Sequence, residues 1–158
     1  MDEKKLIATF EKLGARDPVE WANSQMREGI PQLARFLFLR QAWKKVLSPA
    51  ETSWIDSDLT RDEGGPGGGI VRALRRAQAA SVPREDLAEI VRVKQWELLL
   101  QLCYLLDDPQ IEDADIQDVA WGLFQIDEDG KPGQRISGLH ESLLETDPTG
   151  REMRPGEG

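Results

Sequence analysis

The stretch PREDLAEIVRVKQWELLLQLCYLLDD, residues 83–108, decides the fold class of this chain. In its first half, apolar residues recur three or four positions apart, which is the spacing of one face of an amphipathic helix. In its second half, between Leu98 and Leu106, Gln101 is the only strongly polar residue. A helix that is apolar on every side is typical of a buried element. We therefore expect a helix over about residues 83–107 that ends in the centre of a helical domain.

The apolar half of this stretch is too short to cross a membrane. A spanning helix needs about 20 consecutive apolar residues, and charged residues flank the stretch at both ends. We expect no membrane association.

Weaker helical patterns precede and follow the central stretch. Two helix starts have clear capping residues, namely Asp17 before Pro18 and the capping box Ser48-Pro49-Ala50-Glu51. Together with the apolar periodicity, they predict helices over about residues 4–13, 18–29, 31–47, 49–55 and 70–80, and a last short helix capped by Ser137. The expected fold is mainly α, a compact single-domain bundle of six or seven helices around the central buried helix.

The sequence after residue 113 allows two structures. Apolar residues at i, i+3, i+4, i+7 and i+8 from Ile116 predict a helix over about residues 114–124. Residues 121–126 are also compatible with a strand, because the loop-like stretch DEDGKPG follows them. A small β-hairpin near residues 125–136 is therefore a second expectation.

The length of 158 residues suits one domain. We expect this domain to cover residues 1–148 and to be followed by a flexible tail over residues 149–158, which have little to bury. The N-terminus lacks the apolar region of a secretory signal, and the single cysteine, Cys103, permits no internal disulfide. Both features suit a reducing compartment, so we expect a cytoplasmic protein.

The net charge of −9 is concentrated in one segment. Residues 107–130, hereafter the acidic segment, contain nine acidic residues and no Lys or Arg, so the rest of the chain sums to zero. This balance disfavours nucleic acid, whose binding needs clustered Lys and Arg. It suits either a solvated face or a basic protein partner.

We expect a non-catalytic protein-interaction module, of the kind found in immunity or antitoxin-like inhibitors and in adaptors, that uses this acidic face. Its expected partner-binding residues are Asp113, Asp115, Asp118 and Trp121. Tryptophan is included because it is common at the centre of binding interfaces.

The glycine run at residues 64–69 suggests an alternative function. Backbone amides at a helix start can hold a phosphate, so Gly67, Gly68, Gly69 and Arg72 form a candidate anion site of a small-molecule-binding protein or enzyme. The run lacks the Lys and Ser or Thr of a P-loop, and acidic residues precede it. A flexible connector is the competing interpretation.

His140 and Glu141 are the remaining candidates for chemistry. His140 is the only histidine, which excludes a zinc site with two histidines. No nucleophile motif accompanies it, and the acidic loop at residues 127–138 does not match a calcium-binding loop, because its glycine is in the fourth position. We expect no catalytic residue, no metal and no cofactor.

Overall fold

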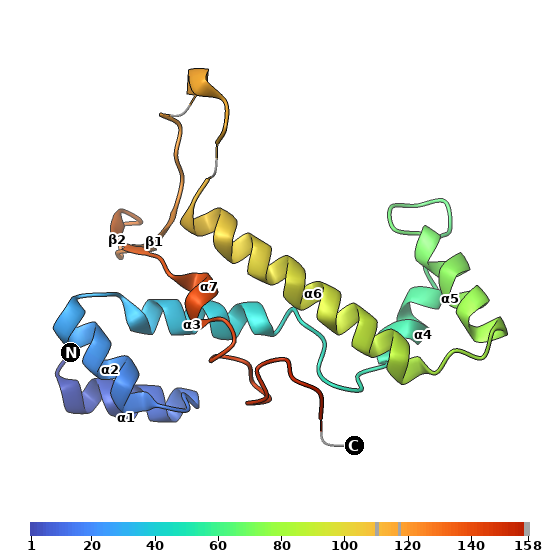
Figure 1. Cartoon of the computed structure of the whole chain (residues 1–158), viewed down its shortest axis with the longest axis horizontal. Coiled ribbons are helices and arrows are strands. Elements are labelled where there is room, and N and C mark those ends of the chain that lie inside the picture. The colour runs from blue at the N-terminus through green and yellow to red at the C-terminus, as the bar shows by residue number, and fades with distance from the viewer. Residues whose placement is uncertain (110, 117, 157–158) are drawn as a thin grey trace. The chain divides into compact units, whose positions relative to one another are not determined.

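The computed structural model describes residues 1–109, 111–116 and 118–156, and over these residues the protein is mainly helical (Figure 1). Within these described residues, the chain forms seven α-helices, one short 3-10 helix and one two-stranded antiparallel hairpin. The predicted fold class is confirmed.

The chain groups into two compact units, residues 1–45 with residues 98–158, and residues 46–97. Helix α6, Arg84–Asp107, contributes to both units. The predicted domain limit at residue 148 stays a prediction. The first unit includes residues on both sides of this limit.

The first unit is built on three helices, α1 (Glu3–Leu13), α2 (Pro18–Glu28) and α3 (Gln32–Trp43). The side chain of Asp17 accepts a hydrogen bond from the Glu20 amide, as expected for the cap before Pro18. The rings of Phe10, Trp21 and Phe36 lie within 5.2–5.8 Å of one another, centroid to centroid. These rings form one hydrophobic cluster together with Leu6 and Ala22.

The second unit begins with a turn where we expected a helix start. Ala50 adopts a positive φ of 59°, and α4 covers Ser53–Leu59. The Glu51 carboxylate accepts from the Ser53 amide at 2.8 Å. The predicted capping box is therefore wrong. The Glu51 side chain bonds to the first residue of α4, which follows it in sequence, and not back toward Ser48.

Helix α5, Gly69–Ala79, follows the glycine run and packs against α4. The run consists of hydrogen-bonded turns, including Gly68 N to Gly65 O at 2.9 Å. A β-carbon on Gly68 would collide with the carbonyl oxygens of Asp62 and Glu63. Glycine is thus required at residue 68 for the close approach of the backbone, and the flexibility of the run stays a prediction.

The predicted bounds of α6 are confirmed, but the burial of its second half is not. Cys103 is fully buried, whereas Leu98, Leu102 and Leu105 are 57 %, 45 % and 45 % exposed. Apolar periodicity indicates which residues favour burial, but it does not supply the elements that must cover them. One covering element that we expected, a helix over residues 114–124, does not form.

Residues 123–126 take the strand alternative. The 3-10 helix Ala114–Ile116 is followed by strand β1, Leu123–Ile126, which pairs with β2, Pro132–Ile136. The helix prediction is wrong, and the hairpin is confirmed with its first strand starting two residues earlier than expected. β-branched and aromatic residues suit the paired, half-exposed strand, and pairing decides between the two periodicities.

The last helix, α7, covers Leu139–Ser142 and contacts α3. Its cap is Gly138, with a φ of 68°, and not Ser137. A β-carbon at Gly138 would lie 2.7 Å from the guanidinium of Arg35, so this tight approach requires glycine. The predicted cap was one residue early.

Candidate functional site: an acidic and apolar surface

Between α6 and β1, the acidic segment contains the 3-10 helix Ala114–Ile116 (Figure 1). Asp113, Asp115 and Asp118 lie on it, and all three are exposed. Their carboxylates make no hydrogen bond or ion pair with any described residue. They are therefore available to a partner.

Trp121 joins the acidic segment to α6. Its indole Nε1 donates a hydrogen bond to the backbone oxygen of Leu105 at 2.7 Å, and the residue remains 43 % exposed. Leu98, Leu102 and Leu105 are spaced four and three residues apart, so they lie on one face of the helix. The predicted tryptophan thus lies at the end of an exposed leucine stripe.

A hollow of about 540 Å³ opens beside the end of this stripe and is lined by Gln101, Tyr104, Leu105 and Asp108. It is more apolar than polar, and an acidic residue stands at its rim.

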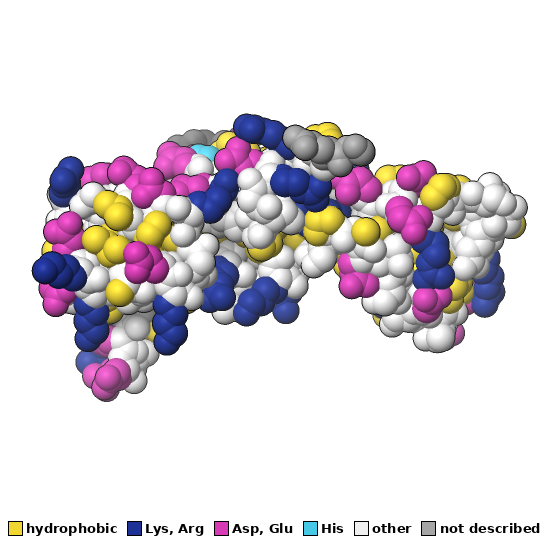
Figure 2. All heavy atoms as spheres, turned by 90° about the horizontal axis from the view of Figure 1, so that it is seen from below, with side chains coloured by type: hydrophobic (Ala, Val, Ile, Leu, Met, Phe, Trp, Pro, Cys, Tyr) yellow, Lys and Arg dark blue, Asp and Glu magenta, His cyan; other side chains and the backbone are white. Residues whose placement is uncertain are grey.

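Apolar exposure continues along the whole region. Among the described residues between 98 and 126, nine large apolar side chains are at least 43 % exposed: Leu98, Leu102, Tyr104, Leu105, Ile116, Val119, Trp121, Phe124 and Ile126. Acidic, basic and apolar side chains are mixed on the face shown in Figure 2. We call residues 98–130 the acidic–apolar surface.

His140 is held by a residue that the sequence did not suggest. Its Nδ1 lies 2.9 Å from Oδ2 of Asp107, and its ring stacks on Tyr104 with a centroid separation of 4.2 Å. The predicted pairing partner Glu141 is its neighbour in sequence but does not bond to the imidazole in any described contact. No local signal links residues 107 and 140, because only the fold brings the end of α6 to the start of α7.

A buried arginine lies close to this pair. Arg35 is 7 % exposed, and its guanidinium donates to Ser142 Oγ at 3.3 Å. Burial lowers the pKa of Arg35, and the charges of Glu141 and Asp107 oppose this shift. Glu141 therefore acts as a counter-charge for Arg35.

The arginine of the candidate anion site pairs with an acidic residue of the chain itself. Glu63 lies 3.9 Å from the guanidinium of Arg72 and forms a second ion pair with Arg75. Gly67 and Gly68 accept the amides of Ile70 and Val71 within the helix start, and Gly69 is the first residue of α5. Of these four residues, Arg72 already has a carboxylate as its partner, and the anion site stays a prediction.

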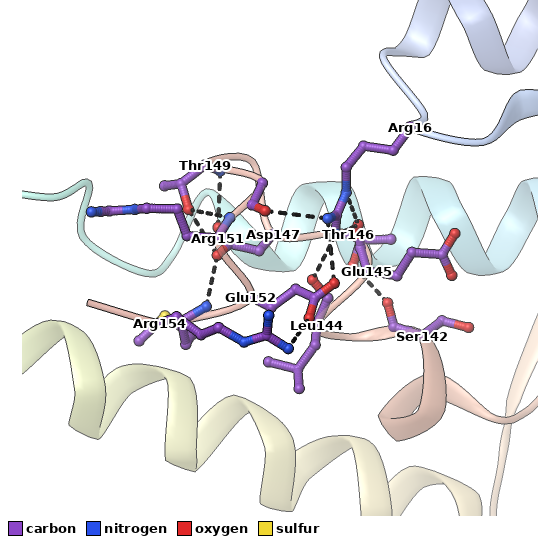
Figure 3. A network of polar contacts seen from close by, with 12 residues as sticks. Arg16, Ser142, Leu144, Glu145, Thr146, Asp147, Thr149, Arg151, Glu152 and Arg154 are labelled. Carbon is purple, nitrogen blue, oxygen red and sulfur yellow. Dashed lines mark hydrogen bonds and ion pairs between the residues drawn. The ribbon is translucent and has the colours of Figure 1, made fainter. Parts of the chain in front are cut away.

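A polar network that sequence reasoning missed centres on Arg16 (Figure 3). The guanidinium donates to the backbone oxygens of Leu144, Glu145 and Gly150 and pairs with Glu152 at 3.4 Å. A pocket of about 390 Å³ adjoins the network. Gly150 and Glu152 are thus bonded to Arg16, although the predicted mobility of the tail as a whole stays untested.

The described part of the chain lacks a membrane-spanning helix and a clustered metal site. There, no helix combines the length and apolar character needed to cross a bilayer. No group of three or more His, Cys, Asp or Glu side chains is arranged to hold a metal ion within the same residues. No protein-family model, no curated protein and no solved structure matches this chain.

Proposed function

We propose that this protein is a non-catalytic interaction module that binds a basic protein through the acidic–apolar surface, as an inhibitor or adaptor does. The observation that carries the proposal is the exposure of nine large apolar side chains in the same stretch as nine acidic residues. Apolar patches of this kind on a protein surface commonly mark interaction sites.

The apolar and the acidic residues of the acidic–apolar surface contribute to binding in different ways. Leu102, Leu105 and Trp121 supply area that gains free energy when water is removed from it. Asp113, Asp115 and Asp118 attract a positively charged partner and favour the correct one over others. Because like charges repel, the same acidic segment disfavours the packing of one copy's acidic face against another's.

The first experiment is capture of partners from the native cell with the full chain as bait, followed by binding measurements with the purified partner. Changing Asp113, Asp115 and Asp118 together to Asn is expected to slow association and to reduce the salt dependence of binding. A matched control changes Glu11, Glu85 and Glu89 to Gln, which removes the same charge from exposed helix positions elsewhere.

The second experiment tests the apolar anchor. Trp121→Ala is expected to weaken binding by about 2 kcal/mol or more if the indole lies at the centre of the interface. Equal binding by the wild-type chain, the triple variant and Trp121→Ala would exclude this surface as the binding site.

The alternative function, a small-molecule or phosphate-binding protein using Gly67–Arg72, has less support. The ion pairs of Glu63 compete with any anion at this helix start. Glu63→Gln is expected to create phosphate binding, measurable by thermal shift, if the site can accept anions at all.

A further inference from the structure

A small pocket in the first unit, separate from the acidic–apolar surface, has the features of a ligand site. It lies between α2, the start of α3 and the chain around α7, and its volume is about 120 Å³. Its lining consists of Glu20, Trp21, Ser24, Gln32, Ser142 and Glu145.

Gln32 provides the first observation that points to a ligand. The residue is 7 % exposed, and its Nε2 donates to Ser24 Oγ at 2.7 Å. Its Oε1 finds no hydrogen-bond partner among the residues that the structure describes. A buried acceptor without a donor is unfavourable, so a donor group that reaches Oε1 from this pocket would supply the missing hydrogen bond.

The charge of the pocket gives the second observation. Glu20 and Glu145 line it, and no Lys or Arg does. Partial burial raises the pKa of Glu145, and Asp17 and Glu20 raise it further, while Trp21 and Arg16 oppose the rise. A positive charge between the two carboxylates would offset this repulsion.

The lining contains one further buried polar atom, the indole Nε1 of Trp21, and this donor lies toward the Glu145 carboxylate, whose pKa it lowers. The acceptor of Gln32 and the two carboxylates are left, and they favour one chemical class. The ligand must carry a positive charge and several N–H donors in a small volume. A primary ammonium has three donors on one charged nitrogen, whereas a guanidinium is a larger planar fork. We propose that this pocket binds a primary ammonium group, supplied by a small free amine or by a lysine side chain.

The test is a titration followed by NMR, because the pocket contains two side-chain N–H reporters, the Gln32 amide and the Trp21 indole. Propylammonium chloride is expected to shift both signals in a saturable way, and propanol at equal ionic strength is not. Glu20→Gln and Glu145→Gln should each weaken binding about tenfold, as expected for loss of a charge-assisted hydrogen bond. Glu11→Gln, an exposed change on α1, is the matched control and should bind normally.

A second series identifies the source of the ammonium. The probes are Nα-acetyl-lysine methylamide and the same compound acetylated at Nζ. If Nα-acetyl-lysine methylamide binds and propylammonium does not, the pocket is assigned to a lysine side chain. If propylammonium binds and the lysine compound does not, the pocket is assigned to a free amine. Binding of both assigns it to the ammonium group in general. Absence of saturable shifts with both amines, or equal binding of propanol, would overturn the proposal, provided that spectra of the wild-type chain show a folded protein.

Discussion

Nδ1 of His140 lies 2.9 Å from Oδ2 of Asp107, so the one histidine of the chain links the start of α7 to the end of α6. The same Oδ2 accepts the backbone amide of Leu139 at 3.0 Å. Asp107 therefore fixes both the helix start and the imidazole.

Asp107→Asn is expected to destabilise the fold by about 1–3 kcal/mol, because the amide replaces a partly buried carboxylate that accepts two hydrogen bonds. Urea unfolding measures this change. Asp118→Asn, at an exposed position, should leave the free energy of unfolding unchanged. The effects of Asp107→Asn and His140→Ala should not add in the double variant, since the two residues share one interaction. Strict additivity would contradict the link.

The two glycines at the start of α5 should respond to alanine in opposite ways. Gly68→Ala is expected to cost about 1–3 kcal/mol, because the added methyl group would collide with backbone oxygens of Asp62 and Glu63. Gly69→Ala meets nothing within 4 Å and should stabilise the protein by about 0.4–1 kcal/mol. Thermal unfolding of both variants checks this pair, and equal effects would show that the glycine run is a loose connector.

Leu6 is a core residue and Leu102 is a surface residue, so substitutions at the two positions should differ in their effect on stability. Leu6→Ala should cost about 2–5 kcal/mol, since this side chain is fully buried. Leu102→Asp should change stability by about 0.5 kcal/mol or less, because the residue is 45 % exposed. Chemical denaturation distinguishes the two, and loss of folding in Leu102→Asp would mean that this face of α6 is covered.

Cys103 should be inert in the folded protein. Burial, with a contribution from Asp107, raises the pKa of its thiol to about 11. The reactive thiolate is therefore scarce near neutral pH, and the residue has no exposed surface. A thiol reagent at mildly alkaline pH should label the chain only after urea is added. Rapid labelling without urea would contradict the burial.

Glu145 gives a pH dependence with a defined sign. Because its pKa is raised in the folded state, the folded protein binds more protons at this group than the unfolded chain does. Its contribution to stability is therefore lost as the pH rises from the unfolded value, 4.5, through the raised one. Glu145→Gln should become more stable relative to the wild-type chain over the same rise. Parallel stability curves for the two proteins between acidic and neutral pH would contradict the shift.

The sequence by itself determined most of the helices. Asp17 before Pro18 and Gly29 after Glu28 delimit α2 through local hydrogen bonds and backbone freedom, which need no distant contact. The bounds of α6 follow from its long apolar pattern between Pro83 and Pro109 in the same way. The exposure of the acidic segment was also predictable, because isolated charges are costly to bury.

Only the tertiary structure decided the elements whose choice depends on a distant partner. Residues 123–126 form a strand because residues 132–136 pair with them, and His140 finds Asp107 because α7 lies at the end of α6. The pocket between Glu20 and Glu145 likewise combines residues from both ends of the chain. Local periodicity shows which side chains favour the interior over water. Which helix faces are covered depends on the packing of elements that are far apart in sequence. Among the described residues, no such element covers Leu98, Leu102 and Leu105 of α6, so these residues stay exposed.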